Sequence, residues 1–404
     1  MPLFVVGHAS HPDWRHALAL AAAQIEGQRA RAAGETAEPS LGLVYFTDHY
    51  APHAQALLEA LRQRWPGVAW AGTVGVGVAA SGVEYFDEPA LVLMLAALPA
   101  GRFQVFSGAK PLGRIEAHTA LIHADGHTPD LADLLDDMSA RTTSGYLFGG
   151  LSSSRTVSCQ IADGVLQGGL SGVAFSRDVA LVSRVTQGCQ PIGPVRRITA
   201  CERNVVTALD GEPALACLLR DAGISLDEPR QAMNTLRGTL VGLSDARQML
   251  LAQGGQFGTD TRVRNLIGLD PGQHGVAIAG MLDPGMQLAF CQRDVQAARR
   301  DLVRICAEIR DELAPEPAWP VASVAAFGAE NPRPADPLTR MAGAIYISCA
   351  GRGGPHFGAP SAELQIVQRA LGDIPLVGFF AAGEIGHHHL YGYTGVLTVF
   401  TLAA

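Results

Sequence analysis

One pattern recurs along this chain and limits its possible folds more than any other feature. An apolar strand, an amphipathic helix, a second apolar strand, a glycine-rich segment and a further strand follow each other in residues 43–46, 57–65, 68–71, 72–82 and 91–95. The same order returns in residues 119–123, 131–138, 146–150 and 170–175, and again in residues 344–348, 364–371, 375–380 and 396–402. Strands that alternate with helices in this way are typical of α/β units, in which a helix connects two parallel strands.

The repetition predicts a mixed α/β fold, with α+β character, built as two related halves that arose by internal duplication. We expect mixed sheets flanked by helices rather than a solenoid, because the copies are unevenly spaced along the chain. The expected domains are residues 1–225 and residues 226–404. The composition of residues 226–262 allows either a helical lid or a linker.

Two local signals lie before the last copy. Residues 276–279 and 286–291 flank the sequence Asp283-Pro284-Gly285, which favours a tight turn, and together they predict a β-hairpin. Asp294 directly precedes a stretch with apolar residues at helical spacing, so we expect its carboxylate to cap a long helix.

Composition and charge exclude several classes of protein. The formal net charge is -8 at pH 7, which is unsuited to neutralising phosphates, so we expect no nucleic-acid partner. No apolar run reaches the roughly 18 residues of a membrane span, and the N-terminus lacks the features of a signal peptide. We therefore expect no membrane partner. Seven cysteines without a C-x-x-C pair indicate a reduced, cytoplasmic protein.

Signatures of common enzymes are missing or weak. The chain contains neither a G-x-x-x-x-G-K-[ST] loop nor a G-x-S-x-G nucleophile elbow. Residues 75–80 imitate a dinucleotide-binding G-x-G-x-x-A, but no helical pattern follows them, so a Rossmann cofactor site is not expected. Gly149 and Gly150 precede Ser152 and Ser153, an arrangement that fits a backbone nest for an anion and a polar turn equally well.

Two segments near the C-terminus carry reactive side chains. Cys349 ends an apolar strand, and Arg352 and His356 nearby could lower the pKa of its thiol, although a buried structural thiol fits the same pattern. Residues 387–389 form a run of three histidines close to Glu384. One of these side chains could ligate a metal or haem, or the run could simply be a loop that enters the last strand. Covalent haem is excluded because no C-x-x-C-H motif exists.

Several long segments resemble the FIST family (F-box and intracellular signal transduction). In the middle of the chain these are residues 187–194, 198–200, 204–206 and 209–214. In the C-terminal part they are residues 266–271, 346–353, 375–385 and 390–395. The segments follow the family order, and the resemblance covers about residues 30–404.

The resemblance implies a sensory module that binds an amino acid or a small carboxylate and couples to a signalling partner such as a histidine kinase. Carried over position by position, it points to the ends of the glycine-rich strands as the ligand pocket. The candidate ligand-binding residues are Gly72, Thr73, Gly149, Gly150, Ser152, Ser153, Cys349, Gly351, Arg352, Gly353, Gly383 and Glu384.

Glycines let backbone N–H groups approach a ligand closely, and an arginine can hold a carboxylate through two hydrogen bonds. Arg352 would then hold the carboxylate of the ligand, and Glu384 would accept from its ammonium group. The alternative is a structural ion pair between Arg352 and Glu384.

Three functions remain open from the sequence. The first is a ligand-binding sensor with no catalytic residues, no metal and no output domain of its own. The second is a haem-based nitric-oxide sensor that regulates a histidine kinase, because some stand-alone family members resemble such sensors. The third is an enzyme that uses Cys349 as its nucleophile.

Overall fold

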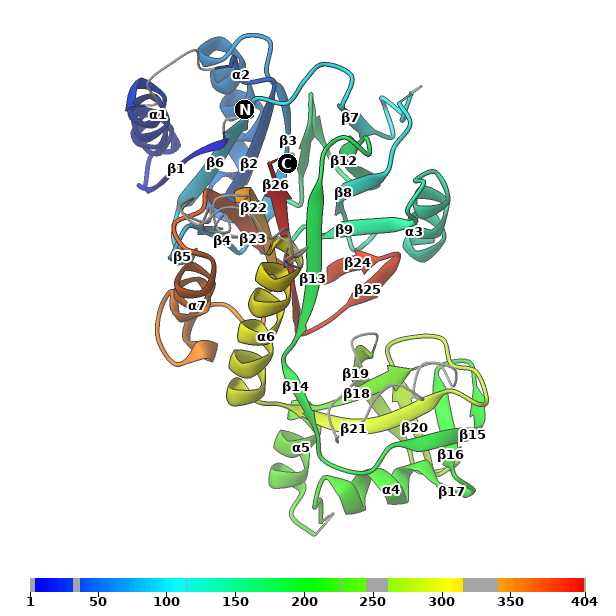
Figure 1. The fold of residues 1–404 in the computed structure, drawn as a ribbon. Coiled ribbons are helices and arrows are strands. Elements are labelled where there is room, and N and C mark those ends of the chain that lie inside the picture. Colours follow the sequence, from blue (N-terminus) through cyan, green and yellow to red (C-terminus); the bar gives the residue numbers. More distant parts are fainter. Residues whose placement is uncertain are drawn as a thin grey trace, which may run out of the picture.

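A computed structural model describes residues 4–31, 37–113, 115–225, 227–244, 261–314 and 341–402. Figure 1 shows a large body that contains both termini and a smaller part below it, formed by the middle of the chain. The helices in these ranges are α1 (Trp14–Arg31), α2 (Ala54–Arg64), α3 (Leu131–Ala140), α4 (Ala214–Asp221), α5 (Pro229–Gly238), α6 (Val295–Leu313) and α7 (Ala362–Leu371), with the 3₁₀ turns η1 (Asp48–His53) and η4 (Gly354–Phe357). None of them is long and apolar enough to cross a membrane.

Three copies of one strand pattern build the body. The first contains β1 (Phe4–Ser10), β2 (Leu41–Thr47), β3 (Ala69–Gly75), β4 (Gly77–Ala80), β5 (Val83–Phe86) and β6 (Ala90–Ala96). The second contains β7 (Phe103–Ser107), β8 (Thr119–Ala124), β9 (Tyr146–Leu151), β10 (Gln160–Ala162), β11 (Val165–Leu166) and β12 (Leu170–Phe175). The third contains β13 (Leu181–Gln187), β22 (Met341–Cys349), β23 (Leu376–Ala381), β24 (Glu384–His387), β25 (His389–Tyr391) and β26 (Thr394–Thr401).

Each copy pairs its strands in the same way. A helix connects two parallel neighbours, so that β2 pairs with β3 across α2, β8 with β9 across α3, and β22 with β23 across α7. The last strand of each copy then pairs antiparallel with the first strand of the parallel pair: β6 with β2, β12 with β8, and β26 with β22. The expected mixed α/β fold built from related units is confirmed, and the structure contains three of these units.

The copies exchange their hairpins in a cycle. Hairpin β4–β5 of the first copy extends the sheet of the third next to β23, and β24–β25 of the third extends the sheet of the second next to β9. Hairpin β10–β11 of the second copy extends the sheet of the first next to β3. Each of the three six-stranded sheets therefore ends on strands from another copy, which ties the copies together.

These exchanged hairpins correct one expectation. Residues 72–82 were expected to form a glycine-rich loop, but they continue β3 and then form β4. The glycines are needed inside the strands, because a Cβ at Gly75 or Gly77 would lie within 3 Å of the backbone oxygen of Gly77 or Tyr85, respectively. The strands therefore approach each other more closely here than side chains would allow.

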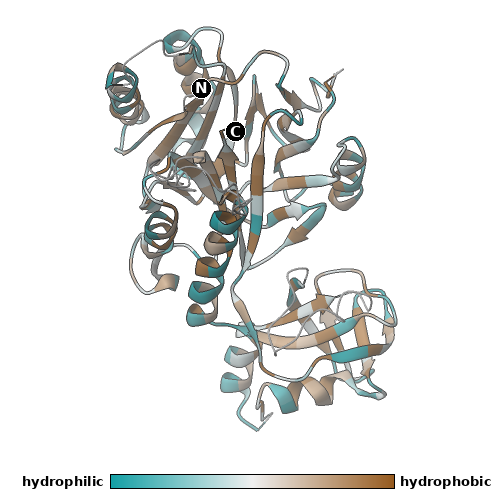
Figure 2. Ribbon diagram, in the orientation of Figure 1, coloured by the Kyte–Doolittle hydropathy of each residue, from teal (hydrophilic) through white to brown (hydrophobic). Residues whose placement is uncertain are grey.

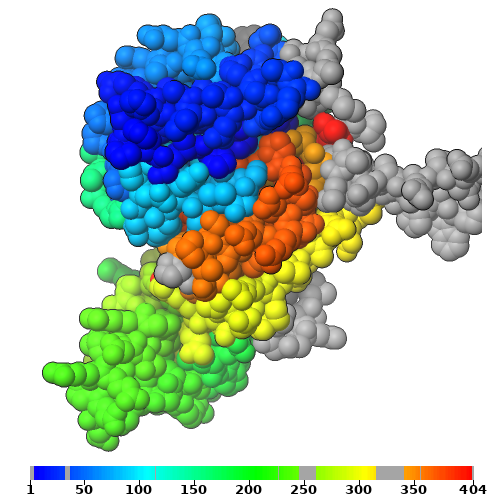
Figure 3. Space-filling view, turned by 90° about the vertical axis from the view of Figure 1, so that its left-hand side faces the viewer, coloured from blue at the N-terminus to red at the C-terminus, as the bar shows by residue number. Residues whose placement is uncertain are grey.

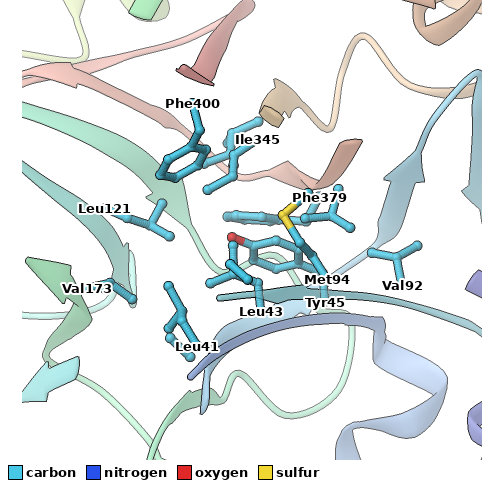
Figure 4. Close-up of a cluster of buried hydrophobic side chains, with 14 of the residues drawn as sticks. Leu41, Leu43, Tyr45, Val92, Met94, Leu121, Val173, Ile345, Phe379 and Phe400 are labelled. Carbon is cyan, nitrogen blue, oxygen red and sulfur yellow. The ribbon is translucent and has the colours of Figure 1, made fainter. Parts of the chain in front are cut away.

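The main core lies where the three sheets face one another. Figure 4 shows Leu43 and Tyr45 of the first sheet, Leu121 and Val173 of the second and Ile345 of the third meeting in this cluster. The outer faces of the sheets are covered by helices: α1 and α2 on the first, α3 on the second, and α6 and α7 on the third. Figure 2 shows apolar strands inside and helices with hydrophilic outer faces, as expected for sheets buried on both faces.

A small barrel is inserted into the third copy between β13 and α6, and Figure 3 shows it projecting below the body. Its strands are β14 (Cys189–Pro191), β15 (Arg196–Glu202), β16 (Val205–Leu209), β17 (Glu212–Pro213), β18 (Thr239–Ser244), β19 (Arg262–Asp270), β20 (Gly275–Ile278) and β21 (Gln287–Arg293). The sheet with the strand order β21-β15-β16-β20-β19-β18 is closed into a barrel, because β18 also pairs with β21. The barrel has a core of its own, which contains Ile198, Val241 and Phe290.

The structure of the barrel and of the segments next to it tests the hairpin, the helix cap and the lid or linker expected from the sequence. The hairpin expected from residues 276–291 is wrong, because β20 pairs with β16 and β19 while β21 pairs with β14, β15 and β18. The cap at Asp294 is confirmed, since its carboxylate accepts from the backbone N–H of Ala297 at 2.5 Å. Within residues 226–262 the structure places α5 and β18, and residues 245–260 lie outside the described ranges. The boundary after residue 225 falls inside the barrel segment and stays a prediction.

Candidate functional site

Two of the expected ligand-binding glycines, Gly72 on β3 and Gly149 on β9, face the backbone of a neighbouring strand, whereas a Cβ at Gly150 would meet the side chains of Ala381 and Ile347 at 2.8 Å. Gly72 pairs with Val44, and a Cβ at Gly72 would lie 1.7 Å from the Val44 carbonyl oxygen. Gly149 pairs with Ile122 in the same way, with a corresponding distance of 2.0 Å. Such distances forbid any side chain, so strand approach alone explains these two glycines. Their contact with a ligand stays a prediction.

Hydroxyl groups at the same strand ends are engaged inside the protein. Thr73 Oγ1 and Ser152 Oγ share a hydrogen bond of 2.6 Å. Ser153 Oγ accepts from the N–H of Val76 at 3.0 Å and donates to the carbonyl oxygen of Phe380. These bonds join segments of all three copies. They favour the polar-turn interpretation of the serines over an open anion nest.

Arg352 forms a buried ion pair with a residue that sequence analysis did not select. Its Nη2 lies 2.7 Å from Oε1 of Glu363 on α7, and each residue is only 1 % exposed. Tyr346 and Ser348 also donate to the Glu363 carboxylate, at 2.6 Å and 3.0 Å. The alternative ion pair between Arg352 and Glu384 does not form, because α7 places Glu363 directly over the face of β22 that carries Tyr346 and Ser348.

Glu384 is fully buried but only half of its carboxyl group has partners. Its Oε2 accepts from the N–H of Thr394 at 3.1 Å and from Thr394 Oγ1 at 2.8 Å, whereas Oε1 has no partner. Burial raises the pKa of Glu384 to about 8, so the group is mainly protonated at neutral pH. A buried polar atom without a partner points to a bound water or ligand.

A second unpartnered atom belongs to Gln187, which is next to Thr394, the residue that donates to Glu384. Gln187 pairs with Thr394 across β13 and β26, so their side chains lie on one face of the sheet. The amide Nε2 of Gln187 donates to the carbonyl oxygen of Thr261 in the barrel at 2.8 Å, while its buried Oε1 has no partner. We call Gln187, Cys349, Glu384 and Thr394 the junction cluster, because β13 leaves the body for the barrel at this point.

Cys349 contributes a thiol to the junction cluster, but the thiol is not activated. Its pKa is raised well above the ordinary value, first by burial and then by Glu384. Arg352 lowers this pKa as expected, but the loss of hydration outweighs its charge, so the expected net lowering is wrong. The described residues also contain no group of three or more His, Cys, Asp or Glu side chains that could hold a metal ion.

The remaining expected residues are glycines that follow Cys349 or precede Glu384 in the sequence. A Cβ at Gly351 would meet the Tyr393 ring at 2.9 Å, and one at Gly353 would meet the Phe86 ring at 2.2 Å. Gly383 contributes its carbonyl oxygen, which accepts from the N–H of Leu151 at 2.8 Å. The structure thus brings Cys349 and Glu384 together, with Gln187 as a nearby residue that sequence analysis missed, and the contact of the glycines with a ligand stays a prediction.

The histidine run is divided between two surroundings. His387 packs edge-on against Tyr146, with ring centroids 4.7 Å apart. His388 and His389 line a 420 Å³ pocket between the tip of hairpin β24–β25, α3 and the barrel, together with Arg262 and Arg264. Sequence analysis missed the two arginines, although their spacing of two along one strand places both side chains on one face.

Two family models match the chain in succession: the FIST N domain over residues 40–212 and the FIST C domain over residues 214–387. The chain is 31% identical to the uncharacterized protein Rv0628c of Mycobacterium tuberculosis (strain H37Rv), over 98% of each chain. It is 30% identical to the uncharacterized protein Mb0898c of Mycobacterium bovis, also over 98% of each chain. Matches of this extent confirm the expected family and place the chain among bacterial relatives. The chain belongs to the FIST family, whose domains are sensory modules of signal transduction.

Proposed function

We propose that this protein is a sensor that binds a small amine-bearing metabolite, such as an amino acid, at the junction cluster. The observation that carries the proposal is a pair of buried oxygens without partners, Gln187 Oε1 and Glu384 Oε1. Both side chains adjoin Thr394, because Gln187 pairs with Thr394 across β13 and β26 and Glu384 on β24 accepts from the Thr394 hydroxyl. Gln187 Oε1 can only accept, so it calls for a hydrogen-bond donor on the ligand, which an amine supplies. A protonated Glu384 can donate to the carboxylate of the same ligand.

The position of the junction cluster suits a sensor rather than an enzyme. Gln187 bonds to Thr261 of the barrel, while Glu384 and Cys349 belong to the body, so a ligand here would touch both parts. The protonated Cys349 thiol offers no ready nucleophile. We propose that the occupied form is recognised by a separate signalling protein, such as a histidine kinase, in the cytoplasm. All seven cysteines are free thiols, which suits that compartment.

A thermal-shift screen of the full chain with amino acids and small carboxylates tests the proposal. A true ligand should raise Tm by several degrees at saturation, because it binds only the folded state. Gln187→Ala should weaken binding at least tenfold. Gln190→Ala, an exposed glutamine on the next strand, should leave it unchanged. The proposal is wrong if no such compound raises Tm, or if Gln187→Ala binds the ligand as well as the parent chain.

A haem-based nitric-oxide sensor is the second candidate, and His389 is the observation that favours it. Burial and the neighbouring cationic side chains lower the pKa of His389 to about 4, so its imidazole is neutral and able to ligate iron. Arg262 and Arg264 line the same pocket and suit the propionates of a haem, which would supply the gas-binding iron.

The absorption spectrum of protein from cells supplied with a haem precursor tests this candidate. A stoichiometric Soret band that moves with nitric oxide and is lost in His389→Gln would support it. A colourless protein that takes up no added haemin would remove it.

A further inference from the structure

The pocket at the tip of hairpin β24–β25 lies apart from the junction cluster. It has a volume of 420 Å³ and is enclosed by the hairpin tip, α3 and one end of the barrel. Much of its lining is apolar, with Leu131 and Leu135 from α3, Leu243 and Met286 from the barrel and Leu390 from the hairpin. A volume of this size fits a small organic molecule.

Positive charge converges on one side of this pocket. Arg262 and Arg264 lie two residues apart on β19, and His388 and His389, with ring centroids 4.0 Å apart, line the same pocket. Burial lowers the pKa of His389, and the neighbouring basic side chains His388, Arg262, Arg264 and His387 lower it further. Such a concentration of cations raises the local potential and attracts anions.

Arg264 is the basic side chain of this pocket that is best suited to hold an anion. Its guanidinium donates to the carbonyl oxygen of Val263 at 3.0 Å, and no carboxylate of the described residues forms an ion pair with it. Burial and the charge of Arg262 lower the pKa of Arg264 to about 10, so the group remains charged at neutral pH. The one acidic residue in the described lining, Asp136, is exposed on α3. A half-buried arginine without a counter-charge is costly unless an anion binds it.

We infer that this pocket binds an organic anion, whose carboxylate or phosphate is held by Arg264 while its apolar body packs against the leucines and Met286. Arginine is suited to both anions because its planar fork donates two parallel hydrogen bonds. The inference is independent of the junction cluster, because none of its residues lines this pocket. An organic anion here would occupy the same pocket as the haem of the second candidate, and protein purified without haem precursor separates the two. Both sites are nevertheless on one hairpin, with Glu384 at its base and His389 near its tip.

Isothermal titration of the full chain, purified without added haem precursor, tests the inference. The probes are phenylacetate, phenyl phosphate and the neutral phenylacetamide, which matches phenylacetate in shape. We expect phenylacetate or phenyl phosphate to bind at least tenfold more tightly than phenylacetamide, with an affinity that falls as salt rises. Binding of phenylacetamide as tight as that of both anions, or no binding of either anion, would overturn the inference.

Variants test whether Arg264 holds the anion through its charge. Arg264→Gln should weaken binding of the anion at least tenfold, whereas Arg197→Gln, on an exposed part of barrel strand β15, should leave it unchanged. Arg264→Lys retains a positive charge and should bind the anion more tightly than Arg264→Gln. An equal loss in both variants would contradict the role of charge. Gln187→Ala should not affect this titration, which separates the inference from the proposed function.

Discussion

Two buried glutamates of the third copy show how partners decide the state of a carboxyl group. Glu363 faces an arginine, a tyrosine and a serine, each of which donates to it, so its charge is compensated by an ion pair and hydrogen bonds. Glu384 accepts from Thr394 and forms no ion pair among the described residues, and burial dominates its pKa. The same side chain is thus a structural ion at one site and a mainly neutral acid at the other.

The raised pKa of Glu384 predicts an unusual dependence of stability on pH. Because the pKa is about 8 in the folded state and near its ordinary value when unfolded, the folded protein binds the extra proton between these values. The contribution of Glu384 to stability is therefore fully present at acid pH and is lost as the pH rises towards 8. The glutamine of Glu384→Gln cannot titrate. The free energy of unfolding of this variant, relative to that of the parent, should therefore increase by about 1.4 kcal/mol for each unit by which the pH rises in this window.

Urea unfolding at several values between about pH 5 and pH 8 measures this difference. Glu202→Gln is the matched control, because Glu202 is exposed on barrel strand β15. Its free energy of unfolding should change with pH in the same way as that of the parent protein. If the free energy of unfolding of Glu384→Gln also changed with pH as that of the parent does, the raised pKa would be contradicted.

At the scale of elements, one position recurs in the parallel strand pairs of all three copies. Gly72, Gly149 and Gly378 each pair with a residue of the first strand of their copy's parallel pair, and each lacks room for a Cβ because of that strand's backbone. At Gly378 the Cβ would lie 1.7 Å from the carbonyl oxygen of Tyr346. The recurrence identifies these glycines as part of the repeated unit, in which they allow the two strands to approach.

We therefore predict that Gly378→Ala destabilises the protein by about 1–3 kcal/mol or more, because the paired strands must move apart. Gly27→Ala is the control, because Gly27 lies in α1 and a Cβ added there would meet no atom within 4 Å. Alanine is preferred in helices by about 1 kcal/mol, so this change should leave stability unchanged or raised. Denaturant unfolding checks both variants. A Gly378→Ala protein as stable as the parent would show that the strands can yield at no cost.

At the scale of the whole molecule, the exchange of hairpins makes the three copies interdependent. Each six-stranded sheet is incomplete without strands from another copy, so no copy is an independent domain. The barrel differs, since its strands pair only among themselves and enclose their own core. Hairpin β24–β25 pairs with β9 of the second copy and contacts β19 of the barrel. It therefore links the body to the barrel beside both proposed sites.

The sequence by itself determined the elements and the family. Apolar runs and helical spacing located β2, α2, β8, α3, β22 and α7, because these patterns depend on neighbours within one segment. The strand-helix-strand order also predicted the parallel pairs, and the resemblance predicted the FIST family correctly. Cys349 and Glu384 were selected together, and the structure places both in the junction cluster.

Only the tertiary structure decided which segments meet. Glycine-rich segments carry little periodic signal, so nothing local indicates that residues 72–82 continue into strands or that each hairpin joins another copy's sheet. The partner of Arg352 is on α7, and the neighbours of His389 are on a barrel inserted far earlier in the chain. Pairings over such distances depend on how the sheets pack, and burial then sets the pKa values of Glu384 and Cys349. Sequence patterns are local and these contacts are not, which is why the sites could be predicted only in part.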